Sequence, residues 1–230
     1  MNSSSSGSAA IKPKTYTLTA IVWAIVIAMI ATAIYMAFII KTVPKTVSNS
    51  KAGIFAELVD HLLVVHESGV GLVPASDYAP INTTLKAKFR ESPWALRASK
   101  TWQLESWNDG EIHDRPLLLV QYRDQDNHKL LLGVIPISKR NFPRTGGFSH
   151  KDAWFFTFGK DYTKAQAEAA YPTKQVASHL DEVTKLESKG LNLVATNYGN
   201  DFYILMLSPV DSKQLGSDLF EMSSIYETAP

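Results

Sequence analysis

Residues 115–137 read RPLLLVQYRDQDNHKLLLGVIPI, and this stretch decides the expected fold. Two apolar runs rich in Leu, Val and Ile flank the polar segment Asp124-Gln125-Asp126-Asn127. Apolar runs of strand length that are separated by a short group of Asp and Asn residues are typical of a β-hairpin. We therefore expect two adjacent antiparallel strands here.

Other strand-like segments lie on both sides of this hairpin. Residues 100–107 (KTWQLESW) precede it, with Asn108-Asp109-Gly110 as the expected turn, and residues 152–158 (DAWFFTF) follow it. Residues 191–198 (LNLVATNY) and 202–208 (FYILMLS) form a second expected hairpin. The sequence thus predicts an antiparallel sheet.

Helical patterns alternate with these strands. Residues 54–67 place Ile54, Leu58, Leu62 and Val65 on one face, which indicates an amphipathic helix. Two more helices are expected in residues 163–190, with Gly190 as the carboxyl-terminal cap, and in residues 212–222.

The connection after the first helix has a different composition. Residues 68–84 are rich in Gly, Pro, Ser and Asn and form an expected loop, and residues 86–99 form an expected short helix or irregular turn that Pro93 ends. Because helices and an antiparallel sheet occur together, we expect a single α+β domain in residues 54–230.

The amino-terminal region has the composition of a membrane anchor. Residues 17–40 read TLTAIVWAIVIAMIATAIYMAFII, and residues 15–40 contain no charged side chain. Such a run exceeds the bilayer core of about 30 Å, so we expect one transmembrane helix in residues 17–40. A signal peptide cleaved after Ala31-Thr32-Ala33 is the alternative, but its apolar region would be shorter than this run.

The flanking segments suggest a topology for this helix. Residues 1–16 form a short polar leader, which we expect in the cytoplasm, and residues 41–53 form a polar linker. Lysines are nearly balanced on the two sides, and long domains cross membranes largely regardless of their charge. We expect a bacterial inner (plasma) membrane protein with a periplasmic carboxyl-terminal domain.

Small side chains recur along one face of the expected membrane helix. Ala20, Ala24, Ala28 and Thr32 are spaced every four residues, which lets a partner helix approach closely. The alternative explanation is that Ala is simply frequent in membrane helices. We keep this face as the candidate packing surface for another membrane protein.

The sequence offers little support for an enzyme. The chain has no Cys, which excludes disulfides, Cys-ligated zinc, iron–sulfur clusters and thiol catalysis. It also lacks the common nucleophile-elbow, phosphate-loop and zinc-protease motifs. We therefore predict no catalytic residue and no cofactor.

Glu111, His113 and Asp114 are the weak candidates for a metal site. If they lay in a strand, Glu111 and His113 would share one face and could converge on an ion. The alternative is that acids beside a hairpin turn are solvated.

A second polar candidate is a basic segment with aromatic residues. Lys139, Arg140, Arg144 and Lys151 lie in residues 138–151, which contain no acid. Such a loop suits an anionic partner, although a solvated loop has the same composition. Nucleic-acid binding is not expected because the net charge is only +1.

Four tryptophans, Trp94, Trp102, Trp107 and Trp154, crowd the first group of expected strands. Aromatic residues in strands usually fill a sheet face, whereas an exposed Trp marks a binding surface.

Residues 94–135 resemble the sensor region of membrane-anchored anti-sigma regulators. The resemblance rests on a hairpin pattern formed by Val120, Tyr122, Asp124, Asp126, Leu130 and Leu132. It implies a sensor or partner-binding module outside the cytoplasm. The sigma-binding helices of such regulators would precede the anchor, where this chain has about 16 residues, too few to fold alone.

These features together predict a single-pass membrane-anchored binding protein. We expect it to be an accessory or assembly subunit of an envelope or membrane protein complex, with the lipid bilayer and another membrane protein as partners. The alternatives are an anti-sigma-like sensor and an anchored enzyme. An enzyme would require Glu111, His113 and Asp114 to line a concave pocket.

Overall fold

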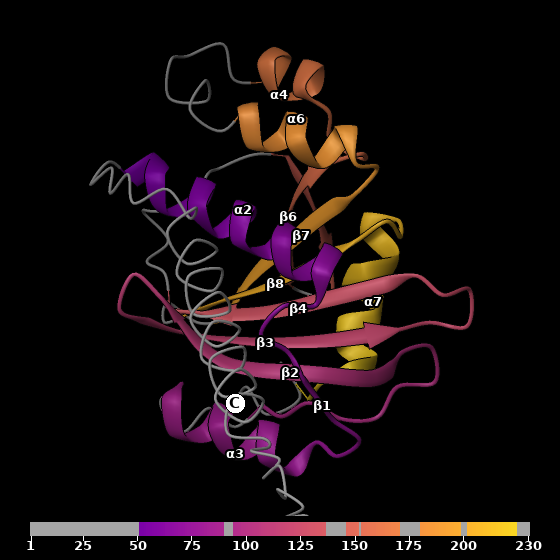
Figure 1. Cartoon of the computed structure of the whole chain (residues 1–230). Helices are drawn as coiled ribbons and strands as arrows, with labels where there is room; N and C mark the ends of the chain where they lie inside the picture. Colours follow the sequence, from indigo (N-terminus) through magenta and orange to yellow (C-terminus); the bar gives the residue numbers. More distant parts are fainter. Residues whose placement is uncertain are drawn as a thin grey trace, which may run out of the picture. The chain divides into compact units, whose positions relative to one another are not determined.

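The chain consists of two compact units, Met1–Val47 and Ser48–Pro230. The computed structural model describes residues 51–89, 94–136, 146–151, 153–170, 180–198 and 202–224, all in the second unit. There, an eight-stranded antiparallel sheet carries helices on both faces (Figure 1). The predicted α+β class with an antiparallel sheet is confirmed.

The sheet has the strand order β1-β2-β3-β4-β8-β7-β6-β5, and all neighbours are antiparallel. The strands are β1 (Val73–Pro74), β2 (Gln103–Ile112), β3 (Arg115–Arg123), β4 (Lys129–Ile135), β5 (Gly147–His150), β6 (Ala153–Gly159), β7 (Asn192–Tyr198) and β8 (Phe202–Ser208). The helices are α2 (Lys51–Ser68), α3 (Ala79–Lys88), α4 (Lys164–Ala170), α6 (Leu180–Ser188) and α7 (Ser212–Met222).

The β3–β4 hairpin forms as the sequence predicts. Arg123 pairs with Lys129, and the intervening turn has Asn127 at a φ of 67°. Asn tolerates this left-handed conformation better than most residues. The Asp124 carboxylate accepts a hydrogen bond from the His128 backbone N–H at 2.7 Å, which further holds the turn.

Two hydrophobic cores lie on opposite faces of the sheet. The first packs α3 and α7 against one face, and the second packs α2 and α6 against the other. Leu118 and Val120 of β3 belong to the first core, whereas Leu117 and Leu119 belong to the second. Because both faces are covered, the central strands are apolar at nearly every position rather than at alternate ones.

The carboxyl-terminal helices are fixed by specific polar contacts. Asp218 of α7 is buried and accepts hydrogen bonds from Trp102 Nε1 at 2.8 Å and from Gln214 Nε2 at 2.7 Å. Burial raises the pKa of this carboxyl group. Helix α6 ends as the sequence predicts: Gly190 has a φ of 65°, and the Leu191 N–H bonds to the Leu186 carbonyl.

Several expectations about local structure were wrong. Asn108-Asp109-Gly110 is not a turn, because β2 continues through it and the chain turns at His113 and Asp114. Helix α3 begins in the segment expected to be a loop, and its buried Ile81 and Leu85 provide the packing that stabilises it. Tertiary burial therefore outweighed the Pro- and Asn-rich composition.

Two strands were not predicted because they are short. Strand β1 has 2 residues and β5 has 4, so neither shows a recognisable alternation. Helix α2 begins at Lys51, inside the expected linker 41–53. The expected helix 163–190 contains α4 and α6, and residues 171–179 between them lie outside the described residues.

In the described part of the chain, the helices fall short of the length and apolarity needed to cross a membrane. The expected leader 1–16, the expected transmembrane helix 17–40 and most of the linker lie outside the described residues. Ala20, Ala24, Ala28 and Thr32 lie outside them as well.

Gly159 provides a test of backbone packing at the end of β6. Its φ is 104°, and an added Cβ would lie 2.2 Å from the Leu191 carbonyl oxygen. We expect Gly159→Ala to lower the free energy of unfolding by more than about 2 kcal/mol. The measurement is chemical denaturation of the purified full-length protein.

Gly190→Ala is the matched control for this variant. Gly190 also has a positive φ, but an added Cβ would meet nothing within 4 Å. We expect a cost of about 1–2 kcal/mol from the left-handed backbone alone. Equal costs for the two variants would contradict the proposed clash with Leu191.

Glu182 of α6 gives a pH-dependent test of the second core. Its side chain is only 5% exposed, and Oε2 has no hydrogen-bond partner among the described residues. Burial raises its pKa, so the ionised form destabilises the folded state. We expect Glu182→Gln to raise the free energy of unfolding at pH 7 by about 1–2 kcal/mol.

The sign of this effect follows from proton linkage. Because the folded-state pKa is raised, the cost of ionised Glu182 is present at neutral pH and disappears as pH falls below the unfolded-state value. The advantage of Glu182→Gln should therefore shrink at acidic pH in urea titrations. An advantage that stays constant with pH would contradict this account.

Candidate binding surface

Glu111, His113 and Asp114 do not form the common site that the strand hypothesis required. His113 and Asp114 are the two turn residues between β2 and β3, with φ values of 51° and 57°. Because His113 leaves the strand, it does not share a strand face with Glu111. It instead pairs through Nε2 with Glu57 of α2.

The acidic group that converges in the described residues lies elsewhere, in the β3–β4 turn. Ligand atoms of Asp124, Asp126 and His128 lie within 4.8 Å of one another. Both Asp124 oxygens already contact His128, one at its backbone N–H and the other at Nδ1, 2.9 Å away. These contacts account for the group as part of the turn, which is the interpretation that the sequence favoured.

The basic candidate segment is only partly described. Lys139, Arg140 and Arg144 lie outside the described residues. Lys151 lies in the turn between β5 and β6, where its Nζ is 5.0 Å from the centroid of the Phe220 ring. This is a cation–π distance, so Phe220 orients the ammonium group.

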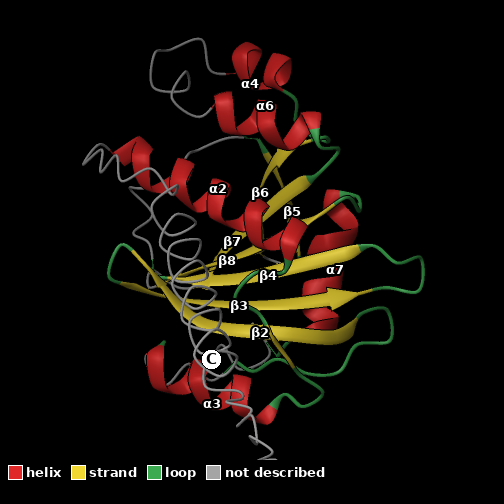
Figure 2. Cartoon of the chain, in the orientation of Figure 1, coloured by secondary structure: helices red, strands yellow, loops and turns green. Residues whose placement is uncertain are grey.

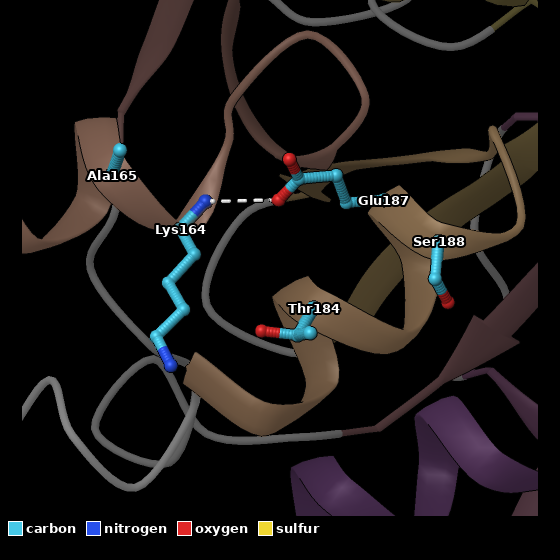
Figure 3. A pocket seen from close by; sticks show the side chains of 5 residues that line it. All are labelled: Lys164, Ala165, Thr184, Glu187 and Ser188. Carbon is cyan, nitrogen blue, oxygen red and sulfur yellow. Dashed lines mark hydrogen bonds between the residues drawn. The ribbon is translucent and has the colours of Figure 1, made fainter.

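A hollow lies between α4 and α6 (Figure 3). It is lined by Lys164, Ala165, Thr184, Glu187 and Ser188, and the Lys164 N–H donates to the Glu187 carboxylate at 3.3 Å. The hydroxyls of Thr184 and Ser188 donate to carbonyls of their own helix. The lining therefore shows no nucleophile that is paired with a base.

The tryptophans differ sharply in exposure. Trp94 and Trp102 are fully buried, whereas Trp154 is 49% exposed. Trp154 lies near the start of β6, opposite Ser149 of the edge strand β5. A Cβ added at Gly147 would lie 3.0 Å from Trp154 Nε1, so the absence of a side chain on Gly147 makes room for the indole.

Trp154 continues an aromatic row on one face of β6. Phe158, four residues later, belongs to the core that α2 and α6 cover, and Phe156, two residues later, is partly buried and packs against that core. The Phe156 ring lies 6.5 Å from the Tyr203 ring, centroid to centroid. Since side chains two residues apart share a strand face, Trp154 points to the same face as these rings but remains half exposed.

Strand register places Trp154 at one particular end of the sheet. Ile135 at the end of β4 pairs with Tyr203, and Tyr203 pairs with Asn197. Phe155 pairs with Thr196 in an antiparallel register, so the preceding residue, Trp154, lies opposite Asn197. The start of β6 therefore lies at the end of the sheet where β4 finishes and β2 turns into β3.

Helix α2 does not begin beside Trp154, because Phe55 in its first turns contacts Phe158 near the other end of β6, with ring centroids 5.1 Å apart. Glu57 in its amino-terminal half pairs with His113 of the β2–β3 turn. In its last turn, His66 Nε2 lies 3.4 Å from the carbonyl oxygen of Lys129, the first residue of β4, at the opposite end. Figure 2 shows α2 running between these two ends of the sheet. Burial lowers the pKa of His66, which favours its neutral form.

The candidate binding surface consists of Trp154 and the β5–β6 turn with Lys151. The pair of His113 and Glu57 lies at the β2–β3 turn. Sequence reasoning missed Glu57 as the partner of His113, since a contact between residues 56 positions apart leaves no local pattern. Sequence reasoning did name Trp154 as a candidate, but it did not distinguish this residue from the other three tryptophans.

The fold and this surface define the class of protein: an α+β domain with an antiparallel sheet covered on both faces and an exposed indole at one end of it. Comparison with known proteins gives no match to a family model, to a curated protein or to a solved structure.

Substitution of the half-exposed Trp154 and of the buried Trp102 tests whether the two side chains differ in solvent exposure as the structure shows. We expect Trp154→Ala to change the free energy of unfolding by less than about 1 kcal/mol, because much of the indole is in solvent. Trp102→Ala removes a buried ring and one of the two hydrogen-bond donors to the buried Asp218, so we expect a loss of about 3–5 kcal/mol. The comparison is made by urea denaturation, and similar losses for both would contradict the exposed position of Trp154.

Proposed function

We propose that this chain is a single-pass membrane protein that acts by binding, as an accessory or assembly subunit of an envelope or membrane protein complex. The observation that carries the proposal is the uncharged apolar run in residues 15–40. At a rise of 1.5 Å per residue, a helix of this run is about 39 Å long, which exceeds the bilayer core. A separate compact unit, Ser48–Pro230, follows it.

The described domain supports binding more than catalysis. Trp154 is a large half-exposed aromatic side chain, and such residues are enriched at recognition surfaces. The enzyme alternative required Glu111, His113 and Asp114 in a concave pocket, but the hollow between α4 and α6 has a different lining. His113 is instead engaged with Glu57.

The proposed topology places residues 1–16 in the cytoplasm and the α+β domain in the periplasm, with the helix in the inner membrane. Its support is the short polar leader and the long following domain. In this arrangement Ala20, Ala24, Ala28 and Thr32 form the face that packs against a partner helix. Lys139, Arg140, Arg144 and Lys151 remain the proposed contacts for an anionic partner.

The experiment is photocross-linking in native membranes with a photoreactive residue at Ala24, followed by purification in mild detergent and mass spectrometry. We expect one stoichiometric membrane protein to be attached, because Ala24 lies in the centre of the small-residue face. A photoreactive residue at Val26 is the matched control, since it lies about 200° away around the helix.

The two positions distinguish specific packing from chance contact. Cross-linking at Ala24 but not at Val26 would support the subunit proposal and identify the complex. Equal yields at both positions would contradict a defined packing face. Recovery of the uncross-linked protein alone from both would contradict a membrane partner at this helix.

A further inference from the structure

We infer that two copies of this chain associate through the outer edge of β5, so that their two sheets become one continuous sheet around a twofold axis. The occupant of the surface around Trp154 is thus a second copy of the same domain. This inference goes beyond the proposed function and does not depend on the membrane anchor.

The first argument is that the outer side of β5 offers backbone groups for pairing. Strand β5 is the last in the sheet, and in the described part of the chain it pairs with β6 alone. The Thr157 N–H donates to the Gly146 carbonyl at 3.0 Å, so this pair is hydrogen-bonded. Because bonded and non-bonded pairs alternate in an antiparallel ladder, the third pair after it, Ser149 with Trp154, is not hydrogen-bonded. The N–H and C=O of Ser149 therefore point away from β6, toward the outer edge.

The second argument is that the sheet protects its other edge but not this one. Strand β1 has only 2 residues, and its Pro74 has no N–H to donate. The adjoining part of β2 carries the exposed acids Asp109 and Glu111. Short strands, Pro and charged side chains are the usual means by which proteins keep a sheet edge unpaired. Strand β5 has 4 residues, and residues 146–150 contain no Pro, Asp, Glu, Lys or Arg.

The charges next to β5 do not oppose association of two copies. A twofold axis at Phe148 places Ser149 of each copy opposite Gly147 of the other. The Lys151 residues of the two copies are then offset by six positions along the strands, which is about 20 Å. This separation exceeds the Debye length of about 8 Å at physiological ionic strength, so their repulsion is screened.

The third argument is that this register explains the exposed indole. A Cβ added at Gly147 would lie 3.0 Å from Trp154 Nε1, although Trp154 pairs with Ser149, so the indole reaches diagonally across β5. In the paired sheets the Gly147 residues of the two copies are diagonal neighbours, about 7–8 Å apart. Aromatic side chains interact over this distance, so the two Trp154 indoles meet across the seam and leave solvent.

The opposite face of β5 is complementary to itself as well. The Phe148 ring stacks on the Phe155 ring, with centroids 5.2 Å apart, and lies against Gly216 of α7. In the paired sheets the two Phe148 side chains lie directly opposite each other, and aromatic pairs of this kind stabilise antiparallel strands. Each contact is thus repeated by the twofold axis, as an interface between identical copies requires.

The experiment measures distances between spin labels in the full-length protein, purified in mild detergent, by double electron–electron resonance. The chain has no Cys, so Lys151→Cys and Asp126→Cys each provide a single labelling site. Lys151 is exposed beside β5, whereas Asp126 is exposed in the β3–β4 turn, on the far side of β8, β7 and β6. We expect label distances of about 20–30 Å at position 151 and of at least about 40 Å at position 126.

Ser149→Pro and Ser149→Ala are the matched variants. Pro removes the outward N–H, a loss that an edge strand tolerates, whereas Ala keeps this N–H. We expect Ser149→Pro to weaken association at least about tenfold, because the twofold axis loses two equivalent hydrogen bonds, and Ser149→Ala to leave it nearly unchanged. Trp154→Ala should weaken association too. Urea denaturation reports whether each variant is folded.

The outcomes decide the inference. Labels at position 151 with no distance shorter than about 40 Å overturn it. A short distance that persists equally in folded Ser149→Pro and in Ser149→Ala shows that the copies meet elsewhere, as they would if only the apolar run in residues 15–40 associated, and overturns the edge pairing. If Ser149→Pro does not fold, Trp154→Ala decides instead, and an unchanged association overturns the inference.

Discussion

The pairing of β4 with β8 is the contact on which the rest of the structure depends. Each strand is the last of a four-strand group, β1 to β4 and β5 to β8, whose members follow one another in the sheet. Leu131 pairs with Leu207 and Ile135 with Tyr203, so this one ladder joins segments about 70 residues apart in the chain. Without it, the two groups would be separate sheets with exposed apolar edges.

This junction also explains why helices are needed on both faces. The central strands β3, β4 and β8 are buried on both sides, so each face must be covered by apolar helical surfaces. Helices α2 and α6 cover one face, and α3 and α7 cover the other. The ion pairs Lys185–Asp60 and Lys189–Glu67 join α2 and α6, but both are exposed and contribute little beside the buried side chains.

The position of α2 follows from its contacts with the sheet. The helix is the first element of the described residues, and it packs along the sheet from the β2–β3 turn toward the start of β4. Its buried Leu58 and Leu62 belong to the second core, which fixes the helix on the sheet.

The sequence alone determined several helices and hairpins, because the residue patterns that predict them lie within the elements themselves. The apolar runs gave the β3–β4 and β7–β8 hairpins, Gly190 gave the end of α6, and residues 212–222 gave α7 with the observed bounds. Only the tertiary structure decided that β4 pairs with β8, that α3 is helical, and that His113 turns toward Glu57. It also decided which of four tryptophans stays exposed, since residues 153–158 are almost uniformly apolar and show no alternation. These features depend on contacts between distant segments, and a local pattern carries no information about which distant surface will cover it.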